Sequence, residues 1–416
     1  MIRIKKLRIE NYKGFSDATI EFGNHITCIA GINGSGKSSC LEALAKSIHA
    51  ILRPIVNPKL KNVIFEDVKE ADINVNSENK CASLSLDFDC GGNNLSQKID
   101  TEGHISRDFE IEEIARSLKK EFTVASYYPV NRSELDIDVS VETDKDLSEK
   151  KESLAGSMAA VTHYKEFFKW FRDREDRENQ EIVSRYKKQS KEIEYEDYAL
   201  KAVRTAISAL LPGFSQMTVE RKKLSIVVNK ENSVLDFSNL SDGEKGIITL
   251  FGDIARRLAI ANENLENPLE GNGIILIDEI DLHLHPSWQR KICHALVQTF
   301  PNCQFVVTTH SPQILGELKT DEIWLLNDFN VYRPDSSFGL TSDQILDEVM
   351  DVIDGDFTLS RDSTVAKRIK DLNLAMETEQ FAEAKKIISE LETATGTKLH
   401  ETESCKIALE MMESEQ

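Results

Sequence analysis

The stretch Gly31-Ile32-Asn33-Gly34-Ser35-Gly36-Lys37-Ser38 decides the fold class of this chain. It fits the pattern G-x-x-x-x-G-K-[ST], and it follows an apolar run at residues 26–30 that is typical of a buried strand. A helix is predicted directly after it, over residues 37–50. Glycines let the backbone curl so that its N–H groups point at phosphate oxygens, and the positive end of the helix faces the same anion. This order of strand, loop and helix predicts a phosphate-binding site in an α/β fold.

Each residue type in this loop has an expected contact. Lys37 is predicted to reach the β- and γ-phosphates of a bound nucleotide, and Ser38 is predicted to bind Mg²⁺. The rest of the loop is predicted to surround the phosphates, and its candidate residues are Gly31, Asn33, Gly34, Ser35, Gly36 and Ser39. The phosphates of a nucleotide and Mg²⁺ are therefore the two ligands that this motif predicts.

A second apolar run, at residues 273–277, ends in two carboxylates, Asp278 and Glu279. Acidic residues at the carboxyl end of a strand lie where ligands bind in open α/β sheets. Asp278 is predicted to bind Mg²⁺ through water, and Glu279 to orient and polarise an attacking water. The next predicted strand, at residues 304–309, ends at His310. This histidine is predicted to hydrogen-bond the γ-phosphate or the water, and the alternative is that it only caps the following helix.

The segment Leu240-Ser241-Asp242-Gly243-Glu244-Lys245 opens a predicted helix over residues 242–261. Ser-x-x-Glu is the pattern of a capping box. A serine and a glycine at the start of a helix can also receive a γ-phosphate. The two interpretations are compatible.

The same segment matches LSxGE, the signature of ABC-type ATPases. Together with the loop at residues 31–38, the Asp278-Glu279 pair and His310, it resembles the SMC, RecF and OLD group of these enzymes. The resemblance implies a P-loop ATPase head, in which a mixed sheet is flanked by helices. It also implies a homodimer or higher homo-oligomer in which Ser241, Gly243 and Glu244 of one subunit close on the ATP of another. Asp281 would then contact the other subunit across the dimer.

Two further segments narrow the resemblance. Asn11-Tyr12-Lys13-Gly14-Phe15 is similar to the N-F-[RK]-x-[FI] opening of RecF- and OLD-like proteins. Residues 278–286 resemble the D-E-x-x-x-x-L-H-P segment of OLD-like ATPases. The Q-loop glutamine of the family is not identifiable, and Asn131 or Arg132 is the candidate to replace it.

The outline as a whole resembles the ATPase subunits of Septu antiphage systems, including those joined to retrons. This resemblance implies a separate HNH nuclease as the partner. About 106 residues follow His310 and contain no D-x-D on a second series of strands. A Toprim nuclease of the OLD type is therefore not expected in this chain.

Composition divides the chain into four predicted parts. Residues 1–140 form the N-terminal lobe of the head, and residues 215–340 form its C-terminal lobe. Residues 141–214 are rich in charges and helical in pattern, which predicts a helical insertion. Residues 341–416 are predicted to be an acidic helical tail.

The net charge of −20 argues against a protein that coats DNA non-specifically. A contact with DNA or a retron nucleic acid would need a local basic patch. The candidates are Arg3, Lys5, Lys6 and Arg8, or Arg221, Lys222 and Lys223, and the alternative is that both are ordinary solvated strand faces.

The seven cysteines include no C-x-x-C pair, so we expect reduced thiols. No apolar run approaches the ~18 residues of a membrane span, and the first residues do not resemble a signal peptide. These features predict a cytoplasmic protein.

Three functions remain open from the sequence. The first is an ATP-hydrolysing subunit of a Septu-like antiphage complex, which dimerises around ATP and regulates a separate HNH nuclease through its acidic tail. The second is a RecF-like DNA-repair or recombination ATPase that binds DNA directly, which the net charge disfavours. The third is a transporter ATPase, which the RecF-like opening disfavours. The hydrolysis rate, the trigger and the stoichiometry stay open.

Overall fold

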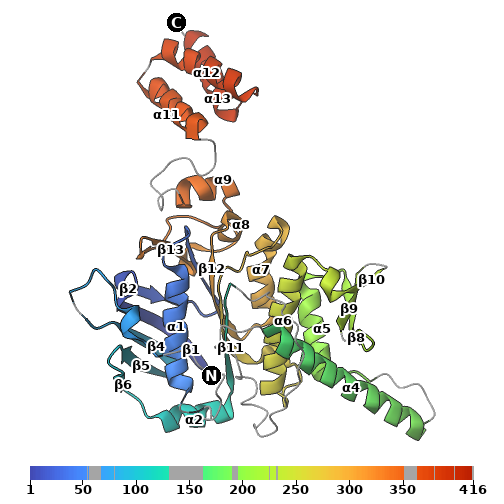
Figure 1. Cartoon of the computed structure of the whole chain (residues 1–416). Helices are drawn as coiled ribbons and strands as arrows, with labels where there is room; N and C mark the ends of the chain where they lie inside the picture. Colours follow the sequence, from blue (N-terminus) through green and yellow to red (C-terminus); the bar gives the residue numbers. More distant parts are fainter. Residues whose placement is uncertain are drawn as a thin grey trace. The chain divides into compact units, whose positions relative to one another are not determined.

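The computed structural model describes residues 1–53, 55, 67–78, 80–130, 163–189, 195–223, 225–230, 233–350, 363–378, 380–397 and 399–414. The chain divides into two compact units, Met1–Gly339 and Leu340–Gln416, which we call unit 1 and unit 2 (Figure 1). Asn131 and Arg132, the candidates for the Q-loop position, lie outside the described residues, as does the first part of the predicted insertion, residues 141–162.

Unit 1 is built on a six-stranded mixed sheet with the strand order β14-β13-β3-β12-β11-β7. Its strands are β3 (Ile26–Gly31), β7 (Thr123–Tyr128), β11 (Asn272–Ile277), β12 (Cys303–Thr309), β13 (Ile323–Asn327) and β14 (Asn330–Tyr332). All pairings are parallel except that of β13 with β14. The residues of β3, β7 and β12 are all buried, as expected for central strands of a parallel sheet. The predicted α/β class with a mixed sheet is confirmed.

A second, antiparallel sheet with the order β2-β1-β4-β5-β6 contributes to the same unit. Its strands are β1 (Ile2–Tyr12), β2 (Phe15–Glu21), β4 (Ser83–Cys90), β5 (Asn93–Asp100) and β6 (Ile105–Arg107). Helix α1 (Lys37–Leu52) shares one hydrophobic core with both sheets, and this core includes Leu44, Leu84 and Ile274. Helix α1 and the antiparallel sheet therefore both pack against the mixed sheet.

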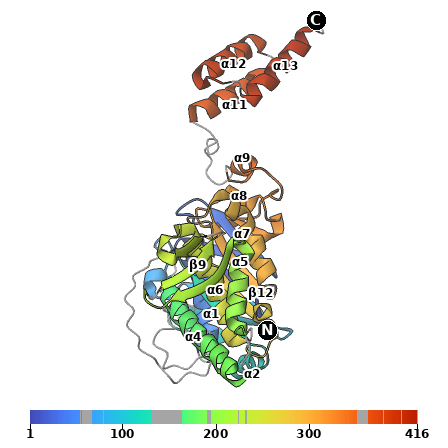
Figure 2. The same ribbon diagram turned by 90° about the vertical axis from the view of Figure 1, so that its right-hand side faces the viewer.

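Helices of the C-terminal lobe and of the predicted insertion pack together in unit 1 (Figure 2). They are α4 (His163–Gln189), α5 (Tyr198–Leu210), α6 (Asp242–Ala261) and α7 (Pro286–Thr299). A Cβ atom at Gly252 of α6 would lie 2.7 Å from the ring of Phe167 on α4, so this glycine allows the two helices to approach. Two shorter helices, α2 (Ile111–Lys120) and α8 (Pro312–Leu315), complete the α-helices of unit 1 among the described residues.

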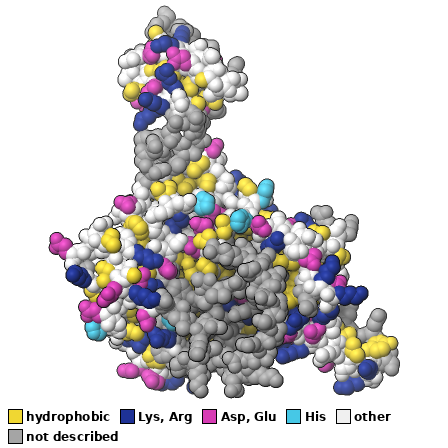
Figure 3. Space-filling model, viewed as in Figure 1, with side chains coloured by type: hydrophobic (Ala, Val, Ile, Leu, Met, Phe, Trp, Pro, Cys, Tyr) yellow, Lys and Arg dark blue, Asp and Glu magenta, His cyan; other side chains and the backbone are white. Residues whose placement is uncertain are grey.

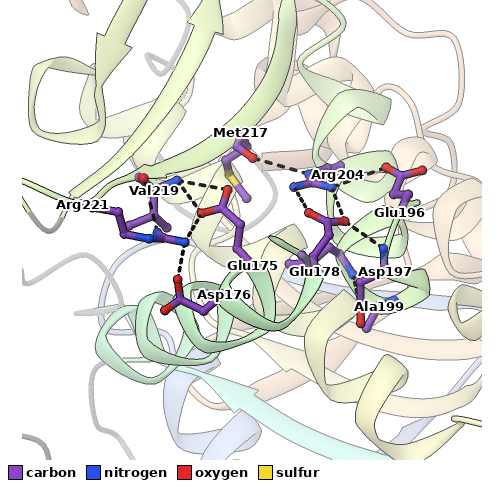
Figure 4. A network of polar contacts seen from close by, with 11 residues as sticks. Glu175, Asp176, Glu178, Glu196, Asp197, Ala199, Arg204, Met217, Val219 and Arg221 are labelled. Carbon is purple, nitrogen blue, oxygen red and sulfur yellow. Dashed lines mark hydrogen bonds and ion pairs between the residues drawn. The ribbon is translucent and has the colours of Figure 1, made fainter. Parts of the chain in front are cut away.

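A three-stranded sheet, ordered β10-β9-β8, leads into α6. Its strands are β8 (Phe214–Glu220), β9 (Ser225–Lys230) and β10 (Ser233–Asp236). Figure 4 shows how α4 and α5 hold the edge strand β8. Glu175 of α4 accepts a hydrogen bond from the backbone N–H of Val219, and Arg204 of α5 donates to the carbonyl oxygen of Met217. Backbone groups at the edge of this sheet are thereby satisfied.

Two buried carboxylates of α4 form the ion pairs in this contact. Glu175 lies 2.8 Å from Arg221, and Glu178 lies 3.2 Å from Arg204. Burial raises the pKa of Glu175, and the bonds from Val219 and Arg221 offset only part of that rise. The described part of the predicted insertion is thus fixed to the sheet that precedes α6.

Unit 2 consists of helices with a small core of their own. Its elements are α9 (Ser342–Gln344), a π-helix over Ile345–Met350, α11 (Ser363–Glu377), α12 (Phe381–Thr395) and α13 (His400–Ser414). Leu372, Ile388 and Leu409 belong to one buried cluster. Residues 340–416 contain 18 acidic and 8 basic residues, so half of the net charge of −20 lies in this unit.

Candidate nucleotide site

The loop between β3 and α1 has the backbone that its glycines allow. Gly34 and Gly36 have φ angles of 83° and 106°, which L-residues with a side chain rarely adopt. A Cβ atom at Gly31 would overlap the carbonyl oxygen of Leu326. The first turn of α1 contains no acidic residue, so its positive end stays available to an anion.

Two side chains of this loop fit an oxygen-rich ligand. Lys37 is 5% exposed, and its Nζ donates to the carbonyl oxygens of Gly31 and Ile32, each at 2.8 Å. Burial lowers the pKa of Lys37, against the opposing attraction of Glu279 and Asp278. The hydroxyl of Ser35 is buried without a hydrogen-bond partner among the described residues. A buried hydroxyl of this kind is costly unless a ligand or water satisfies it.

The strand order brings the predicted catalytic residues to the same edge of the sheet as this loop. Strand β12 lies between β3 and β11, and all three run in the same direction. In the register, Thr309 is opposite Ala30, and Val307 is opposite Ile277. Asp278 and Glu279 therefore follow a strand that is separated from the strand before the Lys37 loop by β12 alone.

Thr308 of β12 joins the two carboxylate residues. Its hydroxyl donates to Oδ1 of Asp278 and accepts the backbone N–H of Glu279 at 2.7 Å. Asp278 is 2% exposed, and Glu279 has a φ angle of 45°, in the left-handed region. Thr308 was not among the residues predicted from the sequence. The only sequence signal for it is a hydroxyl residue near the end of a continuous apolar strand.

Asp281 is positioned to orient His310 within its own subunit. The hydroxyl of Thr309 donates to Oδ1 of Asp281 at 2.5 Å, and Nδ1 of His310 lies 3.3 Å from Oδ2 of Asp281. The side chain of Asp281 is 3% exposed, whereas that of His310 is 49% exposed. The N-cap residue of α8 is Ser311, so the alternative that His310 caps this helix is wrong. The predicted contact of Asp281 across a dimer stays a prediction.

The start of α6 forms the predicted capping box. Ser241 is the N-cap, and its hydroxyl and backbone N–H donate to the carboxylate of Glu244 at 2.8 and 2.9 Å. Burial by itself would raise the pKa of Glu244, but the hydrogen bonds from Lys230 and Ser241 outweigh it and lower this pKa. Ser241 is exposed, whereas Gly243 is buried, and a Cβ atom there would lie 2.5 Å from the carbonyl oxygen of His283. The close approach of the His283 backbone thus explains why residue 243 is a glycine.

Residues 26–316 match the model of a family described as "AAA domain, putative AbiEii toxin, Type IV TA system". The chain belongs to this family. It is an ABC-type, SMC-like ATPase by its motifs, and the P-loop of the family implies ATP binding. The buried hydroxyl of Ser35 and the open end of α1 are the features of this chain that fit such a ligand.

Proteins that are similar to this ATPase in sequence are named after retrons and after Septu. It is 30% identical over 419 residues to the Retron Ec83 probable ATPase of Escherichia coli, a match that covers 84% of this chain and 76% of that protein. It is 26% identical over 373 residues to the Septu protein PtuA of Bacillus thuringiensis, covering 84% of each. Among solved structures, an SmcHead bound to the C-winged helix domain of ScpA is similar with a TM-score of 0.45 and 19% identity, covering 81% of this chain and 98% of that chain.

The exposed part of the loop lies at its tip and at the start of α1. Asn33, Gly34 and Ser38 are exposed, and Ser39 is half-buried. Within the described residues, no group of three or more His, Cys, Asp or Glu side chains could hold a metal ion. Mg²⁺ is usually bound by one or two carboxylates together with substrate phosphates, so the Asp278 carboxylate and the Ser38 hydroxyl are groups of the kind that it requires.

The ATPase pairs many of its basic residues with acidic ones. Arg8 lies 3.0 Å from Asp17, and Arg221 lies 2.7 Å from Asp176. On the face drawn in Figure 3, Lys and Arg side chains are interspersed with Asp and Glu. This pairing favours solvated strand faces over a nucleic-acid patch at these positions.

All seven cysteines are free thiols, as expected. In the described part of the chain, no helix is long and apolar enough to span a membrane.

Proposed function

We propose that this ATPase hydrolyses ATP between two copies of unit 1, and that it serves in a Septu-like antiphage complex in which it regulates a separate HNH nuclease. The observation that carries the proposal is the single sheet edge at which β3, β12 and β11 bring together Lys37, His310 and the Asp278-Glu279 pair. Relatives named after a retron and after Septu support the antiphage setting.

At this edge each residue has a distinct task. Lys37 exchanges the carbonyl oxygens of Gly31 and Ile32 for phosphate oxygens. Ser38 and Asp278 hold Mg²⁺, which when bound neutralises the charge of the phosphates. Glu279 orients and polarises the attacking water, while Thr308 fixes the backbone N–H of Glu279.

His310, which Asp281 orients, completes the site on the side of β12. Its exposed ring can hydrogen-bond the γ-phosphate or the attacking water. Because Asp281 already contacts Thr309 and His310 in its own subunit, we assign it first to holding this ring.

The start of α6 supplies the second half of the site from the other subunit. Ser241 and Asp242 are exposed there, while Glu244 holds the serine in the N-cap position. The N–H groups at a helix start attract an anion, so two copies can close on ATP with each signature serine facing the other copy's nucleotide. This arrangement makes dimerisation dependent on ATP.

Thr308→Val keeps the shape of the side chain and removes its hydroxyl. The loss leaves the Asp278 carboxylate and the Glu279 N–H without this partner, and a hydrogen bond to a charged group contributes about 1.5–3 kcal/mol. We expect kcat for ATP hydrolysis to fall roughly tenfold or more. Steady-state phosphate release measures it, with Thr308→Ser, which keeps the hydroxyl, as the matched control. An unchanged kcat in Thr308→Val would refute the role of Thr308.

The acidic unit 2 is the proposed docking surface for the nuclease partner. Because unit 2 has its own core, deleting residues 341–416 should leave unit 1 folded. We expect the truncated protein to lose co-purification with a co-expressed HNH nuclease of a Septu-like system, and to keep ATP-dependent dimerisation. Co-purification at the level of the full chain would show that the nuclease docks elsewhere.

The alternative of a RecF-like ATPase that binds DNA directly has weaker support. It predicts ATP-dependent DNA binding that weakens steeply with salt. The ion pairs of Arg8 and Arg221 and the charge of −20 oppose it. A titration of duplex DNA at two salt concentrations, with ATP present, separates the two functions.

A further inference from the structure

The turn between β13 and β14 holds an aromatic residue in a strained backbone conformation. Asp328 and Phe329 have φ angles of 44° and 61°, in the left-handed region. A two-residue hairpin turn of this kind normally contains Asn-Gly or Asp-Gly, since glycine adopts such angles without strain. A residue with a side chain is strained at these φ angles, and such strain persists only where the surrounding structure maintains it. The strained backbone therefore suggests that the Phe329 side chain has a role.

This turn lies beside the nucleotide loop. Strand β13 pairs in parallel with β3, and Leu326 is opposite Gly31, the residue at which β3 ends and the loop begins. The backbone N–H of Phe329 donates to the carbonyl oxygen of Ser35 at 3.1 Å. A direct backbone hydrogen bond therefore joins the nucleotide loop to a turn that lies about 290 residues later in the sequence.

The ring of Phe329 fills a space that two glycines leave open. A Cβ atom at Gly36 would lie 2.6 Å from this ring, and one at Gly14, in the turn between β1 and β2, would overlap it. The ring also packs edge-to-face on Phe15, with centroids 5.1 Å apart and planes at 85°. Phe329 is therefore packed between the loop and the β1–β2 turn.

We propose that Phe329 is a positioning residue for the ATP site, which holds Ser35 and Gly36 in the conformation that receives the phosphates. The inference rests on the proposed function of this loop. Phe329 contacts the loop and the β1–β2 turn, whereas Glu279 is held by Thr308. Phe329 therefore acts on the affinity for ATP and leaves the rate of the bound complex unchanged.

Phe329→Ala tests this inference. We expect the Kd of a non-hydrolysable ATP analogue to rise about tenfold, because small displacements of binding groups have large effects. The kcat at saturating ATP should stay within about twofold. The matched control is Phe338→Ala, since Phe338 is 67% exposed. A purely structural role would lower Tm and leave the affinity of the folded protein unchanged.

Wild type and Lys37→Ala are titrated in parallel. If the wild type itself fails to bind the analogue, the proposed function fails. If the wild type binds and Phe329→Ala binds equally well, only the positioning role is overturned. Should Phe329→Ala not fold, Phe329→Leu replaces it, with an expected loss of about threefold. Wild-type affinity in Phe329→Leu would then overturn the inference.

Discussion

Glu279→Gln is expected to lower kcat for ATP hydrolysis by about 10³-fold while ATP still binds. The amide has the size of the carboxylate but cannot take a proton from the attacking water, and general bases contribute roughly 10²–10⁴-fold. The backbone at Glu279 should keep its shape, because Thr308 holds the N–H groups of Glu279 and Ile280 without using the carboxylate. Phosphate release and ATP-analogue titration measure the two effects separately.

The same variant should accumulate as a closed dimer in ATP and Mg²⁺. Light scattering after gel filtration detects it, and adding Ser241→Arg in the Glu279→Gln background should abolish it by obstructing the exposed start of α6. The control for the chemical change is Glu317→Gln, since Glu317 is exposed on the surface. Wild-type hydrolysis by Glu279→Gln would show that another group activates the water.

Lys37→Ala is expected to weaken ATP binding by about 10²–10³-fold. Lys37 is 5% exposed and can form charge-assisted hydrogen bonds to phosphate, so its removal should cost about 3–4 kcal/mol of binding free energy. Calorimetry with a non-hydrolysable analogue measures the loss. A second readout is Tm, because a ligand that binds only the folded state raises it and should raise it far less in this variant.

Lys119→Ala is the matched control for that experiment. Lys119 is exposed in the last turn of α2. It is distant in the sequence from the nucleotide loop and makes none of the contacts described above for that loop. It should bind ATP as the wild type does. An affinity for ATP in Lys37→Ala equal to that of the wild type would contradict the assignment of the loop.

Much of the fold was predictable because its signals are local. The helix predicted over residues 242–261 is α6, Asp242–Ala261, and the strands before the nucleotide loop and before Asp278 lie within a residue of their predicted limits. Capping by Ser241 and Glu244 spans only three positions, so neighbouring residues suffice to specify it. Strand β2 begins at Phe15, directly after a tight turn at residues 11–14.

Other elements were missed because their evidence is not local. Strand β14 has only three residues, and the apolar run of β13, although typical of a buried strand, does not by itself indicate which strand it pairs with. Strand β13 is stabilised by pairing with β3, from which it is separated by nearly 300 residues. For the same reason nothing in the neighbourhood of Phe329 indicated that its ring packs on Gly14 and Gly36.

The sequence by itself determined the loop that curls around phosphate, the helix cap at Ser241 and the pair of carboxylates after a buried strand. Each depends on φ angles, hydrogen bonds or burial within a few neighbouring residues. Only the tertiary structure decided that β12 separates β3 from β11, that Thr308 links Asp278 to Glu279, and that Asp281 faces His310. Those contacts depend on strand order and register, which follow from packing over the whole sheet.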